Sequence, residues 1–278
     1  MIWQTSRFSV DLGEPRVMGI VNVTPDSFSD GGHHASTQDA LRHCEKLLRD
    51  GAHMLDLGGE STRPGSPAVP LEDELARVLP VARAAVSLGV PVSVDTYKPE
   101  VMRAVLDAGV DIINDIWALR QPGAAAAVAA HPSCGVCLMH MHRDPPTMQS
   151  APMGGDVVQS VLSFLELQAL CLQGLEVEKA RIVLDPGIGF GKTVEQNFAL
   201  LAEQHILCAA GYPVLIGWSR KSSLGAVTGL EVGERMAPSI AAAVLAVERG
   251  ARVVRVHDVR ETVAALAVWS AMRKAGTS

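Results

Sequence analysis

The chain has few aromatic residues, few cysteines and no long uncharged hydrophobic segment. Phe, Trp and Tyr make up 4% of its 278 residues. No stretch of about 18 apolar residues lacks charge, so we expect no membrane-spanning helix. The five cysteines are scattered and odd in number, which favours free thiols in a reducing compartment over a disulfide framework.

The chain also lacks an excess of positive charge. Its net charge is −6, with 24 Lys and Arg against 30 Asp and Glu. No run of basic residues stands out, so nucleic acid is not an expected partner. Anions can still bind in a local pocket. The first residues show no basic start followed by an apolar core, so we expect no signal peptide and predict a cytoplasmic location.

Short apolar segments alternate with longer amphipathic ones along the chain. Several of the short ones are continuous Val, Ile and Leu runs, as expected for a parallel sheet covered by helices. We predict eight strands, at Arg16–Val21, His53–Leu57, Pro91–Val94, Asp111–Ile113, Gly135–Met139, Arg181–Leu184, Pro213–Ile216 and Arg252–Val256.

This alternation predicts an α/β fold, a single (β/α)8 TIM barrel over residues 1–278. An open, doubly wound sheet is the alternative. No linker divides the chain, so we expect one domain. Residues 1–15 precede the first barrel strand and should form a short hairpin at the bottom of the barrel. Two pairs have the spacing of helix capping boxes: Thr193 with Gln196, and Asp258 with Glu261.

Polar residues stand at or just after the ends of all the predicted strands. In a barrel these positions face one rim, where active sites are built. Carboxylates and amides at the mouth suit a flat heterocycle with several N–H donors. The strand-end residues, in chain order, are Asn22, Asp56, Asp95, Asn114, His140, Asp185, Ser219, Lys221, Arg255 and His257.

Two loops after the first two strands have an unusual composition. They are NVTPDSFSDGGHH (22–34) and GGESTRPGSPAVP (58–70), rich in Gly, Pro and Ser and therefore poor helix or strand formers. Long loops over an active rim often act as lids. The side chains of Thr62 and Arg63 can bind phosphate oxygens. Phe28 is suited to close over an aromatic substrate.

Two further patterns each lack something that the chemistry they suggest requires. The segment GIGFGKT (187–193) is similar to a phosphate-binding P-loop, but Pro186 stands where the first Gly is required. His140 and His142 could bind a metal. Such a site needs further His and a carboxylate, and the sequence offers only His257 and Asp residues with other predicted roles.

Taken together, the motifs resemble the dihydropteroate synthases, a family of pterin-binding enzymes. The matching stretches run over nearly the whole chain in family order: MGIVNVTPDSFSDGG (18–32), DLGGESTRPG (56–65), SVDTYKPEV (93–101), IINDI (112–116), CLMHM (137–141), LDPGIGFGKT (184–193), GWSRKSSLG (217–225) and RVHDVRET (255–262). The resemblance implies an alkyl transferase of folate biosynthesis. It would condense (7,8-dihydropterin-6-yl)methyl diphosphate with p-aminobenzoate to give 7,8-dihydropteroate and diphosphate.

The resemblance also implies three groups of binding residues and a set of partners. The pterin ring would be bound by Asp95, Asn114, Met139, Asp185, Lys221 and Arg255. The diphosphate would be bound by Asn22, Thr62, Arg63, Arg255 and His257, with Mg²⁺ near Asn22. The p-aminobenzoate would be framed by Phe28, Pro64, Phe190, Lys221 and Ser222. Sulfonamide inhibitors and a homodimer are further implied.

The resemblance implies a dissociative, SN1-like substitution. Diphosphate leaves readily once Mg²⁺, Arg and His⁺ neutralise it, and Asp30 and Asp185 would stabilise the positive charge left on the pterin methylene carbon. The aromatic amine would attack next and lose its proton afterwards, which needs no nucleophile triad. The expected catalytic residues are Asp30, Arg63, Asp185 and Lys221.

Two other functions remain as alternatives on the same fold. A methyltetrahydrofolate corrinoid methyltransferase shares the ring-binding residues but has no need of two phosphate-handling loops. A non-catalytic pterin-binding paralogue should have lost Arg63, Lys221 or Arg255, and all three are present. The sequence departs from the usual family pattern at Tyr97 and Ile188, where Ser and Phe are common.

Overall fold

The eight predicted strands form one closed sheet. The computed structural model describes residues 1–278 except 24–31, 62–65, 145–146, 149, 151 and 277–278. Within that range the parallel strands lie in the order β8-β7-β6-β5-β4-β3-β10-β9. A parallel bridge between Leu184 and Val214 joins the two edges of the sheet. The predicted barrel is confirmed, and the doubly wound alternative is wrong.

The barrel strands are short and buried. They are β3 (Arg16–Asn22), β4 (Met54–Gly58), β5 (Val92–Asp95), β6 (Ile112–Asp115), β7 (Gly135–Met139), β8 (Ile182–Asp185), β9 (Leu215–Ile216) and β10 (Val253–Val256). Every residue of β4 to β8 is buried. Burial on both faces explains why these strands read as continuous apolar runs and not as an alternating pattern.

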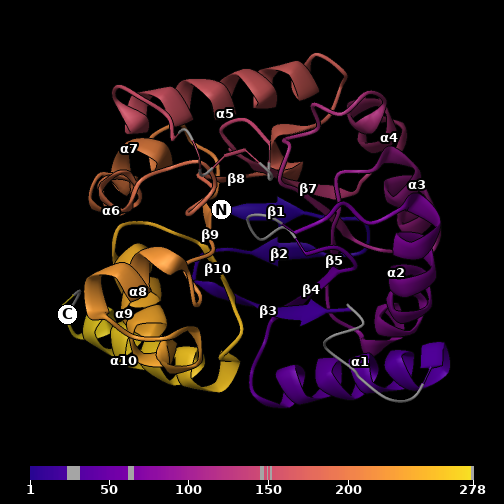
Figure 1. The fold of residues 1–278 in the computed structure, drawn as a ribbon, viewed down its shortest axis with the longest axis horizontal. Helices are drawn as coiled ribbons and strands as arrows, with labels where there is room; N and C mark the ends of the chain where they lie inside the picture. Colours follow the sequence, from indigo (N-terminus) through magenta and orange to yellow (C-terminus); the bar gives the residue numbers. More distant parts are fainter. Residues whose placement is uncertain (24–31, 62–65, 145–146, 149, 151, 277–278) are drawn as a thin grey trace.

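The helices form a ring around the strands (Figure 1). They are α1 (Gly32–Arg49), α2 (Leu71–Ala85), α3 (Pro99–Asp107), α4 (Ala124–Ala130), α5 (Val157–Gln173), α6 (Val194–Ala202), α7 (Gln204–Cys208), α8 (Ser222–Thr228), α9 (Met236–Glu248) and α10 (Val259–Ala275). Short 3-10 turns lie at Val86–Leu88, Lys179–Arg181 and Val232–Glu234. Among the described residues, no helix is long and apolar enough to span a membrane.

The N-terminal residues fill the bottom of the barrel, as predicted. Strands β1 (Ile2–Gln4) and β2 (Ser9–Asp11) form an antiparallel hairpin that lies inside the ring of helices in Figure 1. Trp3 is fully buried, and its Nε1 atom donates a hydrogen bond of 2.9 Å to the carbonyl oxygen of Arg181. Trp3 and Leu12 pack with one inward residue from each of seven barrel strands: Met18, Met54, Ile112, Cys137, Val183, Leu215 and Val253. The hairpin therefore completes the inner core.

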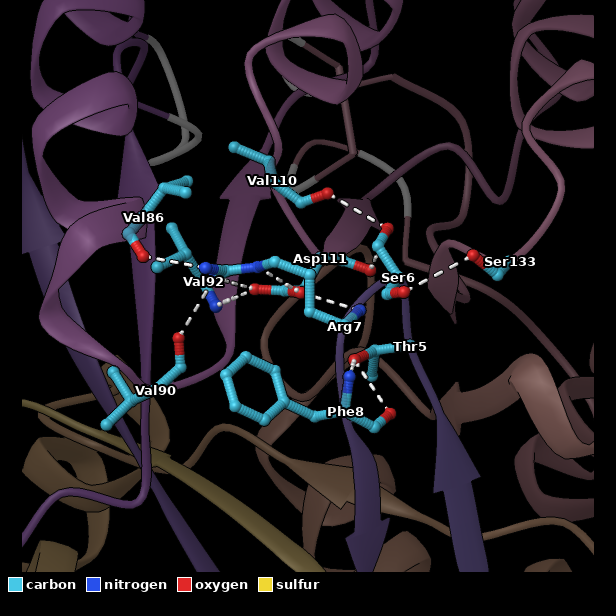
Figure 2. Close-up of polar contacts among 10 residues, drawn as sticks. All are labelled: Thr5, Ser6, Arg7, Phe8, Val86, Val90, Val92, Val110, Asp111 and Ser133. Carbon is cyan, nitrogen blue, oxygen red and sulfur yellow. Dashed lines mark hydrogen bonds and ion pairs between the residues drawn. The ribbon is translucent and has the colours of Figure 1, made fainter.

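One ion pair fastens this hairpin to the barrel (Figure 2). The guanidinium of Arg7 donates two hydrogen bonds to the carboxylate of Asp111, at 3.0 and 2.6 Å. It also donates to the carbonyl oxygens of Val86 and Val90. The carboxylate accepts from the backbone N–H of Val92 as well. Asp111 is fully buried, so its carboxylate has no contact with water. The hydrogen bonds from these donors compensate for the lost hydration.

Candidate active site

A pocket opens at the carboxyl ends of the barrel strands, as the strand-end residues predict. It is open to solvent, and its empty space together with the solvent at its mouth amounts to about 420 Å³. Its walls come from six strands and the loops that follow them, so residues far apart in the sequence meet there. The lining residues are Asp95, Asn114, Ile116, Met139, Asp185, Ile188, Phe190, Gly217, Lys221 and Arg255.

Asp56 organises one side of this pocket. Its Oδ2 atom accepts a hydrogen bond of 2.5 Å from Nε of Arg255 and one of 3.1 Å from Nδ2 of Asn114. A terminal guanidinium nitrogen of Arg255 donates to Oδ2 of Asp95 at 2.9 Å. Asp56 is fully buried, so solvent screens its attraction for Arg255 and Asn114 only weakly. The result is a fixed array across β4, β5, β6 and β10.

Burial and charge set the protonation of this array. Burial raises the pKa of Asp95 to about 7, although Arg255 acts to lower it. Burial also raises the pKa of Asp185, while a hydrogen bond from the Gly187 N–H, 2.7 Å long, lowers it. Burial disfavours the charged form of Arg255, but Asp56 and Asp95 outweigh it and raise its pKa. The guanidinium therefore stays charged beside the Asp95 carboxyl, which can change protonation near neutral pH.

The opposite side of the pocket is aromatic and cationic. Nζ of Lys221 lies 4.2 Å from the centre of the Phe190 ring, a cation–π distance. Phe190 comes from the loop after β8, and Lys221 is the residue just before α8. Phe190 packs with Ile116, Met139 and other apolar residues. This side suits an aromatic ring that carries a negative group.

His257 is fixed next to the pocket by Ser219. The hydroxyl of Ser219 lies 2.9 Å from Nδ1 of His257 and accepts a hydrogen bond of 3.1 Å from its backbone N–H. The guanidinium of Arg220 donates two hydrogen bonds to the Asp258 carboxylate, at 3.2 and 2.7 Å. Asp258 makes no side-chain cap on α10, so the predicted capping box with Glu261 is wrong. The Asp258 carboxylate instead binds Arg220, and this ion pair connects the loop after β10 to the loop after β9.

The structure brings most of the described candidates together. Seven line the pocket: Asp95, Asn114, Met139, Asp185, Phe190, Lys221 and Arg255. Three others are not among its lining residues: Asn22, exposed at the end of β3, Ser222, exposed at the start of α8, and His257. Five candidates lie outside the described residues: Phe28, Asp30, Thr62, Arg63 and Pro64.

Sequence reasoning missed several members of the site. Asp56 is visible as a strand-end acid, but its role depends on partners up to 199 residues away. Ile116, Ile188 and Gly217 line the pocket without any polar signature. Tyr97 donates a hydrogen bond of 2.9 Å to Oε1 of Glu60. This contact holds Glu60, two residues before Thr62, against the loop after β5.

The patterns that were set aside have structural roles. His140 lies away from the pocket, with its ring edge-on to Phe164 at 4.9 Å and Nδ1 2.9 Å from Nζ of Lys192. Lys192, the lysine of the P-loop-like segment, is buried. No group of three or more His, Cys, Asp or Glu suited to a metal occurs in the part of the chain described here. The five cysteines are all free.

Comparisons with known proteins agree with this geometry. Residues 18–257 match the family described as pterin binding enzyme. The dihydropteroate synthase of Escherichia coli strain K12 is 49% identical over 265 residues, which is 95% of this chain and 93% of that protein. The chain belongs to the dihydropteroate synthase family. The members of this family are transferases, so the fold and pocket belong to an enzyme.

Two solved dihydropteroate synthases have the same fold with ligands bound. The Burkholderia cenocepacia enzyme, complexed with 7,8-dihydropteroate, is 50% identical, with a TM-score of 0.91 over 99% of this chain and 98% of that one. The Yersinia pestis enzyme, with a sulfonamide drug complex, is 42% identical, with a TM-score of 0.93 over 99% of this chain and 100% of that one. In both comparisons the structural similarity covers nearly the full length of the two chains.

Proposed function

We propose that this pocket binds a dihydropterin and p-aminobenzoate side by side and joins them with release of diphosphate. The observation that carries the proposal is the convergence of Asp95, Asn114 and Asp185 on one pocket that also holds Lys221 and Arg255. A flat ring with several N–H donors needs carboxylate and amide partners. The 7,8-dihydropteroate bound to the Burkholderia relative is the product that this reaction would form.

The pterin ring is positioned by hydrogen bonds from its edge and by Arg255 against its face. One oxygen of Asp185 accepts from Gly187, so the other is the proposed acceptor for a ring N–H. Asp95 and Asn114 supply the remaining edge contacts, and Lys221 faces the ring carbonyl. Met139 is buried in the apolar wall. Because Asp56 holds both Arg255 and Asn114, the site is preorganised before the ring enters.

The diphosphate is bound on the side of Arg255 and His257, with Thr62 and Arg63 from the second loop. Ser219 orients the His257 imidazole toward this role. Asn22 ends β3 with an exposed side chain, and an amide oxygen is a hard ligand that suits Mg²⁺ together with phosphate oxygens. Bound Mg²⁺ would neutralise charge on the leaving diphosphate. We propose Asn22 as the protein ligand.

The substitution is proposed to be dissociative. The bond between the methylene carbon and the diphosphate oxygen breaks first, and its electron pair leaves with diphosphate. Asp185 and Asp30 stabilise the positive charge that remains on the methylene carbon and the conjugated ring. The nitrogen of p-aminobenzoate then forms the new C–N bond and releases one proton. A normal secondary isotope effect on a deuterated methylene supports this order, and an inverse effect contradicts it.

The p-aminobenzoate ring is proposed to lie against Phe190, with its carboxylate toward Lys221 and Ser222. The cation–π contact of 4.2 Å places the ammonium over the aromatic wall, so a benzoate can be held by stacking and by charge at once. Phe28 and Pro64 would complete the frame. Sulfonamides resemble p-aminobenzoate, and we propose them as inhibitors that compete for this subsite. The sulfonamide complex of the Yersinia relative supports that assignment.

We also propose a homodimer in the cytoplasm. Large apolar side chains are exposed on α9 and α10, with Leu245 46%, Val268 71% and Met272 53% exposed, and these helices pack side by side. Covering such side chains with a second copy would stabilise the assembly. Light scattering should give a dimer for the wild type and a monomer for Val268→Lys with Met272→Lys. A monomeric wild type contradicts the proposal. The five free thiols suit a reducing compartment.

A diphosphate-release assay tests the proposed function. We expect release from the pterin diphosphate that depends on p-aminobenzoate and yields dihydropteroate. Pterin binding without turnover would indicate a non-catalytic paralogue. Methyl transfer from methyltetrahydrofolate to a corrinoid would indicate the methyltransferase. Either of these results, without release of diphosphate that depends on p-aminobenzoate, contradicts the proposal, because the pterin is then not joined to p-aminobenzoate.

A further inference from the structure

Lys192 is a buried amine that none of the proposed catalytic steps uses. It follows β8 in the loop before α6 and is only 3% exposed. Its Nζ atom donates to the carbonyl oxygens of Gly187 at 2.9 Å and Phe190 at 3.1 Å. It lies 2.9 Å from Nδ1 of His140 and 3.3 Å from the His140 carbonyl oxygen. The amine is thus surrounded by acceptors and enclosed.

These contacts close a tight turn. The carbonyl oxygen of Gly187 also accepts from the backbone N–H of Phe190, so Lys192 holds both ends of the segment 187–190. Gly187 has a φ of +68°, and a Cβ atom there would lie 1.9 Å from the carbonyl oxygen of His140. The turn therefore packs directly against the end of β7. Its position depends on a glycine, on His140 and on the buried amine.

The turn carries part of the pocket wall. Ile188 and Phe190 both line the pocket, and Nζ of Lys221 lies 4.2 Å from the Phe190 ring. A Cβ atom on Gly189 would lie 3.3 Å from Cδ of Lys221, so the lysine stem packs against the backbone of the turn. A shift of this turn would move the aromatic wall and the ammonium together. The turn therefore sets the geometry of both groups.

We infer that Lys192 is a positioning residue that holds the Phe190–Lys221 wall in the geometry that receives p-aminobenzoate. This inference rests on the proposed function. Lys192 acts through the turn and not on a ligand, because its amine is enclosed by carbonyl oxygens and His140. The lysine that looks like a phosphate-binding residue in the sequence thus serves the other substrate. Burial lowers the pKa of Lys192 to about 7.

The variant Lys192→Met removes the amine and keeps the length of the side chain. We expect the KM for p-aminobenzoate to rise about tenfold, the equivalent of about 1.4 kcal/mol. The KM for the pterin diphosphate should change by less than about threefold, because Asp95, Asn114 and Arg255 are held by Asp56 and not by this turn. The readout is the fold-change in the KM for p-aminobenzoate divided by the fold-change in the KM for the pterin diphosphate. A general loss of structure would affect both KM values alike and leave this ratio near one.

Arg181→Met is the matched control. Arg181 is also buried, at 4% exposed, and donates to the carbonyl oxygens of Val128, His131 and Cys134, beside the N-terminus of β8. Its loss should lower the thermal midpoint without separating the two KM values. If Lys192→Met changes both KM values equally, or changes neither, the inference is overturned.

A second variant covers the case in which Lys192→Met does not fold. His140→Leu removes one acceptor of the amine and should raise the KM for p-aminobenzoate in the same direction by a smaller factor. An unchanged KM in a folded His140→Leu protein overturns the inference. Wild-type diphosphate release tests the proposed function separately. When the wild type is active and both variants keep its KM for p-aminobenzoate, only the role of Lys192 fails.

Discussion

Nε of Arg255 donates a hydrogen bond of 2.5 Å to Oδ2 of Asp56 and so joins β10 to β4 across the intervening β3. The same oxygen accepts from Asn114, at 3.1 Å. One buried carboxylate therefore sets the direction of a cation and an amide on the same side of the pocket. The predicted substrate contacts depend on this arrangement, because an Arg with free rotamers would lose entropy when a ligand binds.

Asp56→Asn should weaken both the fold and the site. Removing one charge of a buried pair leaves the other uncompensated, so we expect the free energy of unfolding to fall by about 3 kcal/mol. The KM for the pterin diphosphate should rise as Arg255 loses its orientation. Urea denaturation and steady-state kinetics measure the two effects. Asp39→Asn, which breaks an exposed pair with Arg42 on α1, is the control. Equal effects of the two variants would contradict the role of Asp56.

The ion pair of Figure 2 should matter for stability and not for activity. In Asp111→Ala, Arg7 and the N–H of Val92 lose their acceptor, so we expect about 2 kcal/mol of lost stability. The steady-state kcat at 25 °C should be unchanged, because the hairpin lies at the end of the barrel opposite the pocket. Asp11→Ala on exposed β2 is the matched control. A large loss of kcat in folded Asp111→Ala would contradict this division.

His140 should make the fold sensitive to acid. Burial, Lys192 and Arg120 lower its pKa to about 2, while in the unfolded chain it takes up a proton near 6.5. The folded state therefore binds fewer protons between these values, and stability falls as the pH drops below about 6.5. From pH 7 to pH 5 this group should remove about 2 kcal/mol.

Urea denaturation at several pH values checks this pH dependence. His140→Asn keeps an acceptor for Lys192 but has no proton to gain, so its stability should fall less steeply with acid than that of the wild type. His205→Asn, at an exposed position of α7, should keep the wild-type slope. If His140→Asn and the wild type show the same slope, His140 is not the group that titrates.

Ser219→Ala should affect the diphosphate side of the site. The hydroxyl contacts Nδ1 and the backbone N–H of His257, at 2.9 and 3.1 Å. Without it, the imidazole loses its orientation, and the KM for the pterin diphosphate should rise about tenfold. Ser160→Ala on α5 serves as the control. An effect on the KM for p-aminobenzoate alone would place Ser219 in the other subsite.

The fold was predictable because each strand carries its own signal. Apolar runs of Val, Ile and Leu located all eight strands, and β7 was predicted at its observed bounds, Gly135–Met139. The capping box at Thr193 and Gln196 was confirmed because both partners lie within four residues. β9 is shorter than expected, Leu215–Ile216, because Pro213 has no N–H to donate and pairs only through its carbonyl oxygen.

Contacts between distant segments were not predictable in the same way. Asp258 has the spacing of a helix cap, but Arg220 from another loop takes its carboxylate. His140 stands at a strand end, yet it lies away from the pocket, against Lys192 and Phe164. A single sequence shows which residue types reach the rim of the barrel. The directions of their side chains depend on partners that only the fold brings together.

The affinity of Asp185→Asn for a dihydropterin tests the central claim most directly. In the wild type one carboxylate oxygen accepts from Gly187 and the other is the proposed acceptor for the pterin ring. Either orientation of an Asn amide would point its NH2 group at one of these donors. Isothermal titration calorimetry should therefore show the dissociation constant rising at least about tenfold, with the fold intact by circular dichroism. Wild-type affinity in this variant would contradict pterin binding at this pocket.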